Sequence, residues 1–148
     1  MILNFIGLFI LLAGFVIGLG AVTVIDLHGF LGRRSKYWTE ATTRTHKVTK
    51  PLIWIGIFLV IVGEFIFFRN QMFSPSMIYL LIVAIVLILN GFFLSFVVSP
   101  YMLERERHHE EGKLLPKSLQ NKIMVSLLFS DFGWWTSLAL VVWNLVSK

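Results

Sequence analysis

The chain has 148 residues, of which 57% are hydrophobic and only 14% are charged, and its formal net charge is +5 at pH 7. A soluble domain of this length needs a more charged surface, so the composition excludes an ordinary soluble protein and indicates an integral membrane protein. The absence of cysteine excludes disulfides and cysteine metal sites. The positive charges lie between apolar runs, which excludes nucleic acid as a partner and favours anionic lipid headgroups.

Four apolar runs, each long enough to cross a membrane, follow one another along the chain. They are residues 2–25, 51–68, 78–98 and 123–146. Backbone groups inside lipid must form hydrogen bonds within their own segment, so spans of about 20 residues are helices. The sequence therefore predicts an all-α fold, a four-transmembrane-helix bundle formed by one domain, 1–148. The expected helices are about 2–27, 38–68, 77–101 and 116–147.

The polar segment 26–51 organises the predicted topology. It holds six of the thirteen Lys and Arg residues, and the segment 101–122 holds five more. The side of the membrane that carries most basic residues is the cytoplasmic side. We therefore expect a multi-pass protein of the cytoplasmic (inner) membrane, with the N-terminus and the C-terminus both outside.

The two halves of the chain share one plan, in which an inward helix, a basic segment and an outward helix follow one another. A gap-free shift of 75 residues places the two basic segments in register, which is the pattern of a parallel repeat of two helical hairpins. Ser35 or Thr39 is placed to cap a helix that continues through Pro51 into the second span. Pro116 suits the first turn of the fourth helix, so we expect both helices to project beyond the membrane.

Small and polar residues recur at helical spacing on the first and the fourth helix. They are Gly7, Gly14 and Gly18 on the first helix and Ser126, Ser130 and Ser137 on the fourth. Small residues allow helix backbones to approach closely in lipid, and serines form hydrogen bonds across helix contacts. We interpret both stripes as packing faces. The alternatives are a self-association face for the glycines and a polar translocation path for the serines.

Three polar residues lie deep inside the predicted spans, namely Glu64, Asn90 and Asp131. An ionisable side chain at such a depth is costly and marks a candidate functional site. Two carboxyl groups that share a proton would suit proton-coupled transport. The alternative is a local role, in which Glu64 turns outward to Arg69 and Asp131 is accommodated by its neighbouring serine and glycine.

Two histidines, His28 and His46, flank the basic segment at the expected helix ends. If the first helix continues by one turn, His28 joins the face of the glycine stripe, and the hairpin brings His46 toward it. Two imidazoles from facing helices are the usual ligands of haem b in a bundle, and glycines make room for the macrocycle. Copper or zinc would also suit such a pair. The alternative is that both histidines are interfacial residues of the segment.

With its paired hairpins and these histidines, the chain resembles small four-helix bacterial membrane proteins: the membrane domain of copper-resistance type D proteins and the J-type protoporphyrinogen oxidases. The resemblance covers the layout of the whole chain and includes no specific motif. Histidines within the helices of those families bind, or are thought to bind, haem, so the resemblance implies haem binding. In this chain His28 and His46 lie at helix ends rather than inside the spans.

Packing signals are abundant in this sequence, whereas it contains no nucleophile motif, phosphate-binding loop or dinucleotide fingerprint. The sequence therefore favours a non-enzymatic accessory or assembly subunit, present as a homo-oligomer or within a larger membrane complex. Two alternatives stay open. One is a haem-binding redox or porphyrin-handling protein that uses His28 and His46, and the other is a proton-coupled transporter that uses Glu64 and Asp131.

Overall fold

The computed structural model describes residues 1–70 and 74–147. These residues form helices and no β-strand, in the order α1 (Ile2–Gly32), α2 (Lys36–Phe67), α3 (Pro75–Phe93), the π-helical turn η1 (Leu94–Val98), α4 (Ser99–Arg107) and α5 (Lys117–Val146). Because α3, η1 and α4 are continuous, the chain makes four rods, and each rod is long and apolar enough to cross a membrane. The expected all-helical fold with four membrane-span-capable helices is confirmed.

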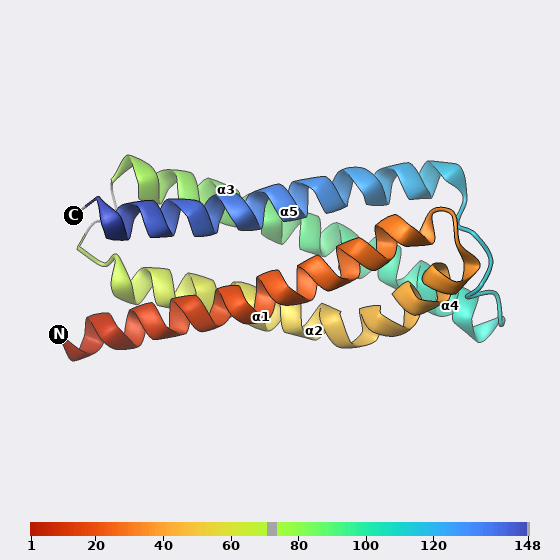
Figure 1. The fold of residues 1–148 in the computed structure, drawn as a ribbon, viewed down its shortest axis with the longest axis horizontal. Helices are drawn as coiled ribbons and strands as arrows, with labels where there is room; N and C mark the ends of the chain where they lie inside the picture. Colours follow the sequence, from red (N-terminus) through yellow and green to blue (C-terminus); the bar gives the residue numbers. More distant parts are fainter. Residues whose placement is uncertain (71–73, 148) are drawn as a thin grey trace.

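The four rods lie along one long axis, with the chain termini at the same end of the bundle (Figure 1). The opposite end holds the turn between α1 and α2, residues 33–35, and the connection between α4 and α5, residues 108–116. We call this the basic end, because both predicted basic segments lie there, and we call the other the terminal end.

The first hairpin is more helical than expected, because α1 continues to Gly32 rather than ending near residue 27. Only residues 33–35 separate it from α2. The Ser35 side chain accepts a hydrogen bond from the Trp38 backbone N–H at 3.5 Å and caps α2, as one of the two expected caps. The Thr39 hydroxyl instead donates to the Gly32 carbonyl at 2.8 Å, which ties the start of α2 to the end of α1.

The third rod extends to Arg107, beyond the expected end near residue 101, and it contains a π-helical turn at Leu94–Val98. Pro100 follows this turn and has no backbone N–H to donate to the preceding turn, so the wider hydrogen-bonding register accommodates it. The turn presents Ser95 to α2, where the Trp54 indole N–H donates to the Ser95 hydroxyl at 3.1 Å.

The most extensive helix contact joins α1 to α2. It depends on glycines, because a Cβ on Gly14 would lie 2.6 Å from the Val60 backbone nitrogen, and a Cβ on Gly56 would overlap the backbone of Gly18. Gly18 also faces the indole of Trp134 from α5, which is almost fully buried. Backbone contact of this kind supplies close van der Waals packing where lipid removes any hydrophobic drive between helices.

A polar contact joins α3 to α5. The Asn90 amide donates to the Ser126 carbonyl at 3.1 Å, and the Ser126 hydroxyl donates back to the Asn90 side-chain oxygen at 2.6 Å. Ser130 and Ser137 are also buried along α5. The third rod is the least buried of the four, and its outward side chains are apolar, as a lipid-facing surface requires.

Candidate functional site

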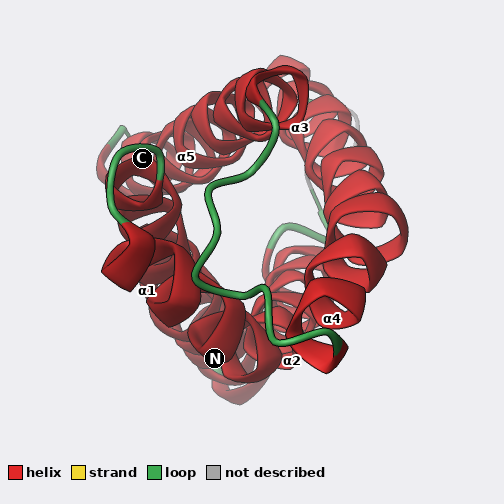
Figure 2. Ribbon diagram, turned by 90° about the vertical axis from the view of Figure 1, so that its right-hand side faces the viewer, coloured by secondary structure: helices red, strands yellow, loops and turns green. Residues whose placement is uncertain are grey.

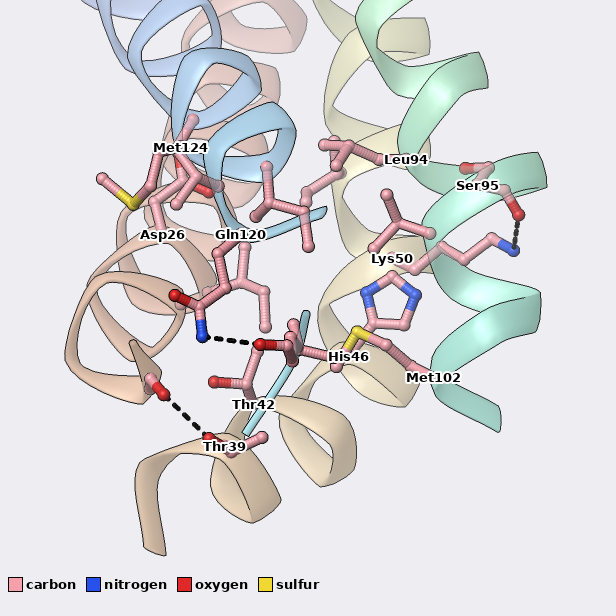
Figure 3. Close-up of a pocket in the computed structure, with 18 of the residues that line it drawn as sticks. Asp26, Thr39, Thr42, His46, Lys50, Leu94, Ser95, Met102, Gln120 and Met124 are labelled. Carbon is pink, nitrogen blue, oxygen red and sulfur yellow. Dashed lines mark hydrogen bonds between the residues drawn. The ribbon is translucent and has the colours of Figure 1, made fainter. Parts of the chain in front are cut away.

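A cavity of about 90 Å³ lies between the rods at the basic end. Its wall is mostly apolar, with side chains such as Ile53 of α2 and Leu94 of η1. Polar side chains reach the same space from three helices: Asp26 from α1, His46 from α2 and Gln120 from α5 (Figure 3). An apolar pocket with a few convergent polar groups is the usual form of a small-molecule site.

Asp26 is the most deeply buried ionisable group that lines this cavity. Asp26 is only 5% exposed, and its Oδ2 atom has no hydrogen-bond partner among the described residues. Asp131 of α5 lies within electrostatic range of it. A buried carboxyl oxygen without a partner is costly, so this atom is poised to bind a donor from a ligand or water.

His46 supplies a second unpaired atom on the same cavity. Its Nε2 is shielded from solvent and has no hydrogen-bond partner among the described residues. The neighbouring cation, Lys50, is differently placed, because its ammonium reaches the Ser95 carbonyl at 3.3 Å and the Ser99 hydroxyl at 3.4 Å. These contacts join α2 to the third rod and hold the positive charge against one wall.

Three further polar side chains of the cavity, Thr39, Thr42 and Gln120, form hydrogen bonds within the protein. Thr39 donates to the Gly32 carbonyl, Thr42 donates to the Trp38 carbonyl at 2.7 Å, and the Gln120 amide donates to the Leu115 carbonyl at 2.9 Å. Asp26 Oδ2 and His46 Nε2 are thus two buried side-chain atoms on the cavity wall that have no hydrogen-bond partner among the described residues.

The segment 108–116 crosses the opening between the helix ends at the basic end (Figure 2). Arg105 holds it in place by donating to the Glu110 carbonyl at 3.0 Å and to the Lys113 carbonyl at 2.5 Å. The Lys113 ammonium bonds the Glu110 carboxylate at 2.6 Å and holds the pKa of that exposed carboxyl below its usual range. Leu115 of this segment lines the cavity.

The predicted histidine pair is placed on two different surfaces. His46 lines the cavity, whereas His28 packs between α1 and α2, with its Nδ1 atom 3.2 Å from the Thr45 hydroxyl and its ring 5.1 Å from that of Trp38. His28 is thus beside the residue that precedes His46, but it is not part of the cavity wall. Haem ligation by the pair stays a prediction, and no group of three or more potential metal ligands occurs in residues 1–70 and 74–147.

The three predicted intramembrane polar residues lie at three separate contacts. Glu64 is buried and lines a second, smaller cavity beside Trp134, while Asn90 bonds to α5. Asp131 is half-buried and lies near Asp26. The Arg69 guanidinium donates to the Asn4 side-chain oxygen at 2.8 Å and to the Ile66 carbonyl at 2.9 Å. It therefore links α1 to the end of α2 at the terminal end.

Sequence reasoning did not select Asp26, because the apolar run ends at Ile25 and the polar segment starts there. A usable signal was the spacing of the buried face of α1. Asp26 stands seven residues after Leu19 and four after Val22, both of which are buried. Those spacings keep a residue on one helix face, so Asp26 continues the buried stripe.

The described residues form a four-helix bundle in which each rod is long and apolar enough to cross a membrane, with a mostly apolar cavity at the basic end. Comparison with protein-family models, with curated proteins and with solved structures finds no match in any of the three.

Proposed function

We propose that this protein binds a small lipid-soluble molecule in the basic-end cavity. The observation that supports the proposal is the pair of unpaired polar atoms, Asp26 Oδ2 and His46 Nε2, on the wall of a mostly apolar cavity. Leaving either atom without a hydrogen bond costs about 1–3 kcal/mol. A ligand that bonds both would remove this cost, and the apolar wall would bind the rest of it.

We also propose which membrane holds the protein and how the protein is oriented in it. The protein resides in the cytoplasmic membrane with the basic end on the cytoplasmic side and both termini outside, because eleven of its thirteen basic residues lie in the segments that meet at that end. Anionic headgroups then contact the basic end. The two hairpins are the two units of a parallel repeat in this arrangement.

The test uses two matched variants of α5 whose positions differ by two residues. Ile123 lines the cavity, whereas Val125 is exposed on the outer face of the helix. We expect native mass spectrometry of the wild-type protein, purified from membranes in mild detergent, to show a retained small molecule. Ile123→Trp fills the cavity and should lose it, while Val125→Trp should retain it.

Two results would contradict the proposal. One is a wild-type protein that carries no bound molecule under these conditions. The other is equal retention by Ile123→Trp and Val125→Trp, which would place the bound molecule outside the cavity. Helical content by circular dichroism is the control for folding in each variant.

A second candidate function is a non-enzymatic accessory or assembly subunit of a membrane complex. It is favoured by the third rod, the least buried of the four, whose outward residues Leu81, Ile85 and Leu89 are all exposed. Such a surface suits the helices of a second copy or of a larger complex as well as lipid. Cross-linking of wild-type membranes should then yield a species larger than the single chain of 17.0 kDa, and a purely monomeric result would remove this candidate.

A further inference from the structure

We infer that the ligand of the basic-end cavity is a quinone or a quinol, a neutral lipid-soluble ring that carries oxygen atoms on opposite sides. This inference rests on the proposed function and names the chemical class of its ligand. Four features of the cavity support it, namely its unpaired atoms, its charges, its walls and its place in the bundle.

The unpaired atoms suit both forms of such a ring. A carboxyl group and an imidazole can each donate or accept a hydrogen bond, according to their protonation. Asp26 Oδ2 and His46 Nε2 therefore match quinone carbonyl oxygens, which only accept, and quinol hydroxyls, which also donate. They come from α1 and α2, so one ring between the helices would bond to two separate elements.

The charges around the cavity disfavour ligands with a full charge of either sign. A lipophilic cation attracted by Asp26 would also meet Lys50 and Arg33, which line the same cavity. A lipophilic anion attracted by these two cations would meet the buried carboxyl group of Asp26. A neutral ligand avoids both conflicts, since it gains hydrogen bonds without bringing an uncompensated charge into a mostly apolar site.

The walls and the volume suit a flat ring. Trp54 is oriented by its hydrogen bond to Ser95, and aliphatic side chains such as Ile53 and Leu127 line the same space. Met102 and Met124 also line it, and methionine adapts its shape to the ligand. The cavity of about 90 Å³ holds roughly six to nine water-sized positions, and a six-membered ring with two oxygens has eight non-hydrogen atoms.

The depth of the site matches a ligand that arrives from the bilayer. Asp26 lies six residues before the end of α1 at Gly32, which is about 9 Å along the helix axis. The segment 108–116 lies across the basic end. A lipid-soluble ring would enter this site from the bilayer, at the side of the bundle, rather than through the basic end.

The experiment measures binding of decylubiquinone and of its reduced quinol to the full-length protein in detergent, by native mass spectrometry. Asp26→Leu and His46→Leu each remove one of the unpaired groups. Glu64→Leu and His28→Leu are the controls, because they remove a buried carboxyl group and an imidazole that lie outside the wall of this cavity. We expect at least a tenfold weaker Kd for the first two variants and less than a twofold change for the controls.

Dodecylamine and oleate, a lipophilic cation and a lipophilic anion, are measured in parallel. If either of them binds in a manner that depends on Asp26 and Ile123 while decylubiquinone does not, the quinone inference is overturned and the proposed function stands. If decylubiquinone binds equally to Asp26→Leu, His46→Leu and Ile123→Trp, the molecule binds elsewhere and the inference is overturned. If the wild type binds none of the three probes and retains no molecule from membranes, inference and proposed function both fail.

Discussion

Asn90 and Ser126 exchange two hydrogen bonds, at 3.1 and 2.6 Å, across the contact between α3 and α5. One bond uses the Ser126 carbonyl, and the other uses its hydroxyl. Interhelical hydrogen bonds in membrane proteins contribute about 0.6 kcal/mol on average and at most about 1.7 kcal/mol. A conservative substitution of Ser126 can therefore measure how much this hydroxyl bond contributes to stability.

Ser126→Ala removes the hydroxyl and keeps the carbonyl bond, so we expect the free energy of unfolding to fall by about 1 kcal/mol. The measurement is unfolding in mixed detergent micelles, followed by circular dichroism. Ser118→Ala is the control, because Ser118 is exposed near the start of the same helix. A loss for Ser118→Ala equal to that for Ser126→Ala would show that the Asn90 contact does not carry the effect.

The α1–α2 hairpin holds the most extensive helix contact of the bundle. Its two helices approach to backbone contact at Gly14, Gly18 and Gly56. This contact sets the rotation of both helices about their axes, and that rotation decides which residues reach the cavity. Asp26 and His46 face the cavity as a consequence, whereas His28 faces Thr45 and Trp38.

Gly56→Ala would place a Cβ against the Gly18 backbone, so the two helices must move apart. We expect a loss of about 1–3 kcal/mol in the free energy of unfolding, the usual cost of overpacking. Gly20→Ala is the matched control, since nothing lies within 4 Å of a Cβ at Gly20. That variant should be neutral or slightly more stable, because alanine favours helix over glycine. Equal stabilities for the two variants would be inconsistent with backbone contact between α1 and α2.

At the scale of the whole molecule, charge is unevenly distributed between the two ends of the bundle. Both predicted basic segments meet at the basic end, while the two termini lie together at the other (Figure 1). The proposed orientation follows from this distribution through the positive-inside rule. Because the chain contains no cysteine, single cysteines can report the orientation without a background signal.

Ser147→Cys and Arg34→Cys place exposed thiols at the terminal end and at the basic end. With a membrane-impermeant maleimide, we expect Ser147→Cys to react on intact spheroplasts and Arg34→Cys to react only after the membrane is disrupted. Labelling in the reverse pattern would invert the proposed orientation. The cysteine-free wild type is the control for nonspecific labelling.

Much of the helix content could be predicted from the sequence, since each of the four apolar runs lies within one rod apart from Phe68, the residue that follows α2. The ends of the helices were less predictable. α1 continues through the polar residues 26–32 and the third rod continues to Arg107. Hydropathy marks where an apolar run ends. The ends of a helix depend instead on its backbone hydrogen bonds and caps, such as the Ser35 cap at the start of α2.

The sequence by itself determined that the described chain makes four membrane-span-capable helices, because the length of an apolar run is a local property and lipid permits few other structures for it. Only the tertiary structure decided that Asp26 and His46 line one cavity and that His28 does not. This outcome depends on the register and rotation of helices in contact. Gly14, Gly18 and Gly56, which do not line the cavity, contribute to both through backbone contacts that no local pattern around Asp26 or His46 encodes.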